Sequence, residues 1–204
     1  FMVYGFIFYD SGHIDNTKLG LLLFASFFIT NGLFVNYGQF LFGWQSAHFD
    51  GLLSNKIELK DFIKAKFLLF TIFSSATFIL CSLYGLMNWR FIALQLAAYL
   101  YTIGFGTVII LYFATMNCKR MDISLNARFN WQGSSYIQWV MSIPLFLIPT
   151  LLYLPFNYFH LPYYGVGAVA VFGLITLLMR SFWIDLLSKK LIKQRYKIAE
   201  GFRE

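Results

Sequence analysis

Long apolar runs separated by short polar segments dominate this chain. Five runs are long enough to cross a bilayer as helices, because a hydrocarbon core of about 30 Å needs roughly 20 apolar residues. The predicted spans are residues 19–42, 67–88, 91–116, 136–156 and 165–187. The pattern therefore predicts an all-α integral membrane protein that forms a single transmembrane domain over residues 1–204.

The first nine residues form a shorter apolar run, which cannot span a bilayer. This run lacks the basic segment and the small-residue cleavage site of a signal peptide. We interpret residues 1–9 as the end of a sixth helix whose beginning is missing, and we expect a missing N-terminal part.

The polar insert at residues 43–66 is predicted to be helical rather than a bare turn. Phe49, Leu52 and Leu53 follow the i, i+3, i+4 spacing of one helical face. A second helix is expected to start near residues 58–59, with Asp61 in its first turn, where the helix dipole favours an acid. The same pattern is typical of an amphipathic helix that rests on lipid headgroups, and this alternative stays open.

Basic residues divide unevenly among the connecting segments. The net charge is +7, and 13 of the 16 Lys and Arg residues lie in three places: the segments after the first and third spans, and the tail at residues 188–204. The positive-inside rule places such segments in the cytoplasm, so the C-terminus is expected there. A topology signal explains this charge better than a nucleic-acid partner does.

The composition supports membrane insertion and argues against several kinds of chemistry. The chain is 59% hydrophobic and 12% charged, against about 25% charged residues in a soluble domain. Only Arg180 and Asp185 approach a predicted span, near its cytoplasmic edge. His13, His48 and His160 fall in connecting segments, and the sequence has no phosphate-cradling or zinc-binding motif. We therefore expect no catalytic residue, metal or cofactor, and no ATP hydrolysis by this chain.

Prolines recur along the fourth predicted span, at Pro144, Pro149 and Pro155, and Pro162 follows. Each proline removes a backbone donor and disturbs the preceding helical turn. The recurrence predicts a proline-broken outer segment that acts as a gate. An ordinary kinked helix is an alternative of about equal weight.

The segment at residues 45–66 resembles the cytoplasmic loop of type-2 ABC exporter permeases. In that family an acidic residue, a small residue and a leucine pair precede a break, and a capped helix then leads into the next span. The matching residues are Leu52, Leu53, Ser54, Asp61, Ala65 and Lys66. The sequence departs from the family at Gln45, Ala47 and Lys56, where Glu, Gly and Pro are usual.

This resemblance implies that residues 44–55 form a coupling helix that docks into a groove of a separate ATP-binding cassette subunit. The residues implied for this contact are Trp44, Gln45, Phe49, Asp50, Leu52 and Leu53. It also implies a second permease half, which is either another copy of the chain or a missing N-terminal half. The whole chain, including residues 129–133 and 196–203, also looks like the C-terminal part of a family of uncharacterised bacterial membrane proteins of unknown function.

Three functions follow as hypotheses for a multi-pass protein of the bacterial inner membrane. The first is a permease subunit of an ATP-driven exporter with a lipid-like or amphipathic cargo. The second is a non-transporting membrane scaffold whose loops recruit partners. The third is a membrane enzyme that acts on lipids, for which the sequence offers no paired acid and base and no metal-binding set.

Overall fold

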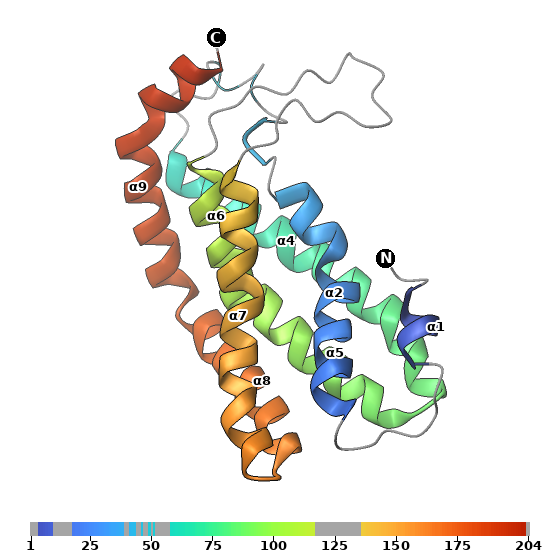
Figure 1. Cartoon of the computed structure of the whole chain (residues 1–204). Coiled ribbons are helices and arrows are strands. Elements are labelled where there is room, and N and C mark those ends of the chain that lie inside the picture. The colour runs from blue at the N-terminus through green and yellow to red at the C-terminus, as the bar shows by residue number, and fades with distance from the viewer. Residues whose placement is uncertain are drawn as a thin grey trace.

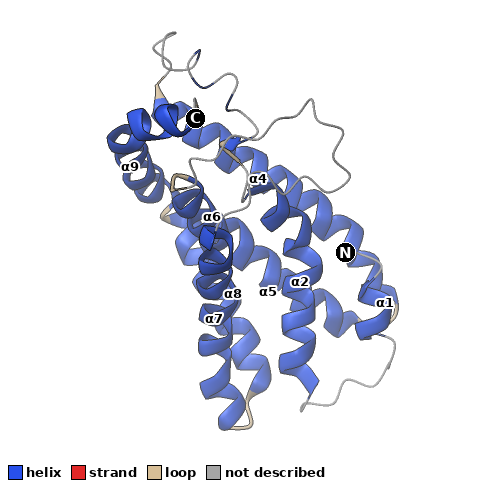
Figure 2. Cartoon of the chain, turned by 45° about the horizontal axis from the view of Figure 1, so that its top comes forward, coloured by secondary structure: helices blue, strands red, loops and turns tan. Residues whose placement is uncertain are grey.

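Helices are the only regular elements in the described part of the chain. The computed structural model describes residues 4–9, 18–38, 41–43, 46, 49, 51, 58–116 and 136–202. In chain order the elements are α1 (Tyr4–Tyr9), α2 (Leu19–Gly38), α4 (Leu59–Cys81), the 3₁₀ helix η3 (Ser82–Leu86), α5 (Trp89–Tyr101), the π-helical turn η4 (Thr102–Gly106), α6 (Thr107–Ala114), α7 (Tyr136–Tyr158), α8 (Pro162–Leu178) and α9 (Arg180–Gly201). The predicted all-α class is confirmed (Figures 1 and 2).

Three helices in this part of the chain are long and apolar enough to cross a membrane: Leu59–Leu86, Trp89–Ala114 and Trp139–Tyr158. The pair α8 and α9 adds a fourth if the two helices, which meet at a 65° bend, form one broken span. Such a set is typical of a multi-pass membrane protein. The prediction of five complete spans is wrong.

The two predicted spans that fail do so for different reasons. Helix α2 forms, but its described apolar stretch, Leu19–Gly32, is shorter than the roughly 20 residues that a bilayer requires. The predicted span at residues 165–187 is interrupted at Met179, where the chain leaves the axis of α8. A hydropathy pattern shows a run of apolar residues but not the direction of the helix axis. The pattern therefore predicted one span where α8 and α9 run in different directions.

Helix α4 starts where the sequence predicted. Its first residue is Leu59, Glu58 occupies the N-cap position, and Asp61 lies in the first turn. The helix then continues without interruption through Cys81, so the predicted second helix of the insert and the next span are one element. The connection from η3 to α5 is short, and the Asn88 side chain caps α5 by accepting a hydrogen bond from the Arg90 N–H at 3.0 Å.

Buried polar side chains join helices inside the bundle. Thr102 Oγ1 donates to Asn31 Oδ1 at 2.7 Å and so links η4 to α2. A 2.7 Å hydrogen bond joins the hydroxyls of Tyr9 and Ser26 and links α1 to α2. In an apolar bundle such bonds hold helices together because the alternative is an unpaired polar group.

The closest helix crossing brings α8 against α5 and η4. A Cβ added at Gly173 would meet backbone atoms of Leu100 and Tyr101 at 2.5 Å, and one added at Gly104 would overlap the Gly173 carbonyl. Gly104 and Gly173 therefore allow the close approach of these helices. Gly106 is different, because its nearest contact, with Leu145 Cδ1 at 3.5 Å, is an ordinary van der Waals distance.

The prolines do not break α7, and the predicted helix breaks are wrong. Pro144, Pro149 and Pro155 all lie inside one continuous helix from Tyr136 to Tyr158. Each proline removes a single backbone donor, and the intervening turns keep the helical ladder intact. Close packing against α8 supports the helix, since Gly165 lies where a Cβ would be 2.8 Å from the Tyr153 ring.

The real irregularities lie elsewhere. Helix α7 ends in a Schellman motif, in which the Leu161 N–H donates to Phe156 O at 2.9 Å and the His160 N–H donates to Asn157 O at 3.1 Å. His160 has the left-handed φ of 58° that this cap requires. Two further irregularities of the backbone are the π turn η4 and the bend at Met179. Neither contains a proline.

The helix ends that flank the three basic segments lie at one end of the bundle. The C-terminal ends of α2, α6 and α9 and the N-terminal ends of α4 and α7 lie together at the top of Figure 1. The α7–α8 turn and the start of α2 lie at the opposite end. The three basic segments predicted from the sequence therefore adjoin the same end of the molecule.

Replacement of Gly173 tests the crossing of α8 over α5. We expect Gly173→Ala to lower the stability of the protein by about 1–3 kcal/mol, because the added methyl group must push two helix backbones apart. The measurement is the thermal midpoint of the purified protein in detergent. Gly167→Ala is the matched control, since a Cβ there meets nothing within 4 Å and alanine improves helix propensity. Equal midpoints for the two variants would contradict this crossing.

Candidate functional site

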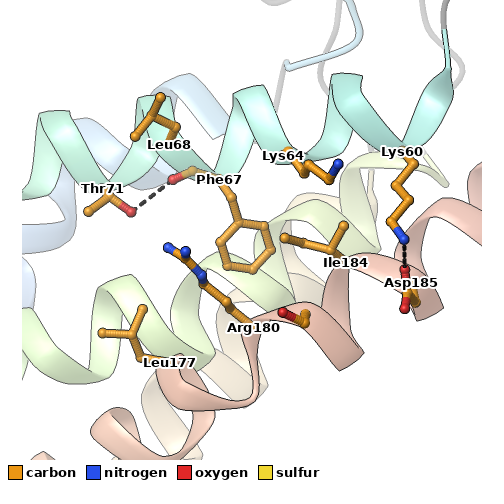
Figure 3. A pocket seen from close by; sticks show the side chains of 10 residues that line it. Lys60, Lys64, Phe67, Leu68, Thr71, Leu177, Arg180, Ile184 and Asp185 are labelled. Atoms are coloured by element: carbon orange, nitrogen blue, oxygen red, sulfur yellow. Dashed lines mark hydrogen bonds and ion pairs between the residues drawn. The ribbon is translucent and has the colours of Figure 1, made fainter.

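A cleft opens between the first turns of α4 and the junction of α8 with α9 (Figure 3). Its volume is about 450 Å³. We call it the junction cleft, and define it by its lining residues: Lys60, Lys64, Phe67, Leu68 and Thr71 of α4, and Leu177, Arg180, Ser181, Ile184 and Asp185 of the junction.

Three cations and one acid line the junction cleft. Lys60 Nζ lies 2.6 Å from Asp185 Oδ1, in an ion pair that joins α4 to α9. Lys64 Nζ lies 2.7 Å from Oδ1 of Asp61, one helical turn away and outside the cleft. The Arg180 side chain has no hydrogen bond or ion pair with any residue that the structure describes. The lining therefore carries an excess of positive charge and favours an anion.

The local sequence explains how these side chains converge. Lys60 and Lys64 are four residues apart and so lie on one face of α4. Arg180 is the first residue of α9, directly after the bend, and Figure 3 shows its side chain reaching toward α4 on the side of Phe67 and Thr71. No side chain caps the first turn of α9, so its backbone N–H groups add positive character to the junction.

Apolar side chains make up much of the rest of the cleft, together with the hydroxyl residues Thr71 and Ser181. Phe67, Leu177 and Ile184 line it, and Leu68 is 62% exposed at its margin. The apolar stretch of α4 begins at Phe67, directly after the basic residues. The cleft thus lies where the basic and apolar parts of a membrane helix meet, which is the usual level of the lipid headgroups.

The lining residues of the cleft offer groups that can bind a charged ligand. The cleft contains no histidine or cysteine and only one carboxylate, which is already paired with Lys60. In the described part of the chain no group of three His, Cys, Asp or Glu residues is placed to hold a metal ion. The cleft therefore offers charge and shape, without a nucleophile and base pair or a metal ligand set.

A second hollow of about 410 Å³ lies between the end of α6, the start of α7 and the second half of α9. Lys197 is its one charged lining residue, and Met116, Tyr136 and Val140 contribute apolar surface. The predicted gate residues Pro144, Pro149 and Pro155 line neither of these two hollows. A gate at these prolines stays a prediction.

The predicted coupling helix is described only at isolated positions. Trp44, Gln45, Asp50, Leu52 and Leu53 lie outside the described residues, so their contact with a partner stays a prediction.

Phe49 is described, and its side chain is buried, with 1% exposure. Its ring centroid lies 6.4 Å from that of Phe42 and 5.5 Å from that of Phe202, both in edge-to-face geometry. The Phe42 ring in turn packs on Phe62 of α4 at 5.7 Å. We call these four rings the aromatic clamp. Neighbours in the folded chain therefore cover Phe49, and its contact with a partner stays a prediction.

In the sequence, Arg180 and Asp185 stand out only as charged residues near the cytoplasmic edge of a predicted span. No sequence pattern predicts the junction cleft. The spacing of Lys60 and Lys64 places them on one helical face, but nothing in the sequence indicates which helix that face meets. The bend at Met179 carries no proline or glycine that would have predicted it. Two features of the sequence could have indicated the cleft. One is the arginine at the end of the last apolar run, and the other is the basic start of a separate helix.

Comparison with known proteins gives one positive result. A family described as a family of unknown function (DUF5687) matches the chain over residues 1–204. Among curated proteins and among solved structures the chain has no significant match.

Truncation of Phe49 tests the aromatic clamp. We expect Phe49→Ala to lower stability by about 3 kcal/mol or more, because removal of a fully buried ring leaves a cavity. Phe49→Ala combined with Phe202→Ala should cost less than the sum of the single changes, since the two rings share one contact. The measurement is the thermal midpoint in detergent. Phe182→Ala is the control, because Phe182 is 54% exposed and should change the midpoint little. Additive losses in the double variant would contradict the contact.

Proposed function

The chain belongs to the DUF5687 family, a family of unknown function, and we propose that it is the permease subunit of an ATP-driven exporter. In this proposal ATP is bound outside residues 1–204, by an ATP-binding cassette subunit, since these residues carry no phosphate-cradling motif. The matches to the type-2 exporter loop at Leu52, Leu53, Asp61 and Lys66 support this proposal.

The observation that carries the proposal is the aromatic clamp. Phe49 belongs to the segment that connects α2 to α4, and its ring packs against Phe42, four residues after the end of α2, and against Phe202 at the end of α9. Phe62 extends the same cluster into α4. A partner that pushes on this segment therefore pushes on α2, α4 and α9 together.

The helices that receive the force flank the irregular parts of the bundle. Helix α9 meets α8 at the 65° bend, and α8 crosses the π turn η4 at Gly104 and Gly173. A tilt of α9 against α4 changes the angle at the bend, which is the kind of rigid-body movement that transporters use. In the proposal this movement opens a path between two permease halves.

The outer surface suits a second permease half or lipid. Large apolar side chains of α4 and α7 are exposed in the single chain, among them Leu68, Ile72, Ile79, Ile143 and Leu151. The path between two such surfaces would be apolar and uncharged. This supports a lipid-like or amphipathic cargo over a small ion.

One observation favours the alternative function, a non-transporting membrane scaffold. Burial of Phe49 against the chain's own helices removes a large apolar side chain from the surface that an ATP-binding subunit would contact. A scaffold needs only a stable bundle with exposed loops. Association with an ATP-binding subunit separates the two functions.

The proposed location is the bacterial inner membrane, with the C-terminus in the cytoplasm. Lys60, Lys64 and the basic residues at the end of α9 belong to helix ends that lie together (Figure 1). The positive-inside rule supports the cytoplasm as the side that this end faces.

Labelling of single cysteines tests the orientation. A membrane-impermeant thiol reagent applied to intact cells should fail to label cysteines placed at Ser54, Asn126 and Gln194, and should label those at Asn16 and Asn157. The physical reason is the preference of Lys- and Arg-rich segments for the cytoplasmic side. Labelling of all five positions after the cells are opened is the control. Labelling at Ser54 from outside would reverse the proposed orientation.

Negative charge introduced at Leu52 and Leu53 tests the contact with the ATP-binding subunit. We expect Leu52→Asp combined with Leu53→Asp to abolish co-purification with the ATP-binding subunit, because a few apolar residues usually dominate such a contact. Lys193→Ala is the control, since Lys193 is an exposed charge on α9. An unchanged thermal midpoint would show that the bundle itself survives. Retention of the partner by the double variant would refute the permease proposal and leave the scaffold as the better account.

A further inference from the structure

We propose that the junction cleft is a binding site for the headgroup of an anionic phospholipid, whose acyl chains lie on the apolar surface beside the cleft. This lipid is a resident of the protein rather than its cargo. The inference does not depend on the permease proposal, since a scaffold with the same fold would bind the same lipid.

The charges of the cleft fit a phosphodiester. Arg180, Lys60 and Lys64 line it, and Asp185 is the one acid in the lining. Asp185 engages Lys60, while Lys64 is held by Asp61 outside the cleft, so neither acid is directed at Arg180. A guanidinium presents two parallel N–H groups to two phosphate oxygens, and basic pockets between membrane helices at the headgroup level bind anionic lipids in this way.

The size and the second half of the cleft favour a lipid over a free anion. A volume of about 450 Å³ lies within the range of about 300–1,000 Å³ that is usual for small-molecule sites and far exceeds the needs of one phosphate ion. Phe67 and Leu177 form apolar walls that a free phosphate would leave uncovered. Leu68, which lines the cleft and is 62% exposed, continues the apolar surface to the margin of the cleft.

The position of the cleft fits the same ligand. Lys60 and Lys64 come from the first turns of α4, and the apolar stretch of that helix starts at Phe67, beside which Arg180 lies (Figure 3). Phosphate and acyl chain meet at the same level of a bilayer. The charged and the apolar residues of the cleft can therefore contact the headgroup and the start of the acyl chains of one lipid.

The test measures lipid that stays bound to the purified protein. The full chain is reconstituted with phosphatidylglycerol or with phosphatidylcholine, extracted into detergent and examined by native mass spectrometry. We expect the wild type to retain phosphatidylglycerol and to retain little phosphatidylcholine, whose choline group is repelled by the cations. Arg180→Gln combined with Lys64→Gln should reduce the retained phosphatidylglycerol about tenfold, since a charge-assisted contact is lost.

Two further variants make the result specific to the cleft. Lys189→Gln removes an exposed charge of α9 outside the cleft and should leave retention unchanged. Arg180→Lys keeps the charge but loses the planar pair of donors, so it should retain more lipid than Arg180→Gln and less than the wild type. The elution volume and thermal midpoint of each variant show whether it remains folded.

Three outcomes would overturn the proposal. The first is equal retention of phosphatidylglycerol by the wild type and the folded double variant. The second is equal retention of the anionic and the zwitterionic lipid. The third is complete displacement of the lipid by inorganic phosphate or glycerol phosphate in excess, which would identify a site for a free anion. Loss of lipid without loss of the ATP-binding partner would separate this site from the proposed transport function.

Discussion

The contact between α8 and the α5–η4 helix is the constraint on which the rest of the structure depends. At Gly104 and Gly173 the two backbones meet with no side chain between them, and no larger residue fits at either position. Membrane helices associate largely through such close packing, because burial from lipid brings little hydrophobic gain. The crossing determines the direction of α8 in the bundle. It therefore also determines the place in the bundle at which the last residue of α8, Leu178, lies. The bend that follows then brings Arg180 and Asp185 of α9 opposite the basic start of α4.

Helix α4 combines two roles because of the order of residues along it. Its first two turns carry Lys60, Lys64 and Asp61, which hold ion pairs and line the junction cleft. From Phe67 onward it becomes an apolar helix whose outer face is open to lipid or to another subunit. The change from charged to apolar within one continuous helix gives the cleft its two unlike walls. A separate amphipathic helix followed by a span would have left those walls on different elements.

Irregular backbone in this protein occurs where packing supports it rather than where proline is present. Three prolines in α7 each remove one donor, yet α8 packs along that helix and it continues. The π turn η4 stands beside the crossing with α8, and Thr107 Oγ1 donates to Thr102 O at 3.0 Å across the widened turn. The bend at Met179 ends the purely apolar α8 and begins the more polar α9. Each departure from a straight helix is therefore held by a neighbour, as the lack of water in a bilayer requires.

The sequence by itself determined the class of the protein, the apolar segments and the start of α4 at Leu59, because these depend on local composition and on the residues of the first helical turn. It could not determine that α7 stays whole across Pro149 or that the last apolar run turns at Met179, since both depend on packing against other helices. The candidate site was hidden for the same reason. Lys60 and Asp185 are 125 positions apart in the chain, and only the crossing and the bend bring their side chains to 2.6 Å. Phe49 likewise followed a surface pattern in sequence, whereas contacts with Phe42 and with the distant Phe202 decided that its ring is buried.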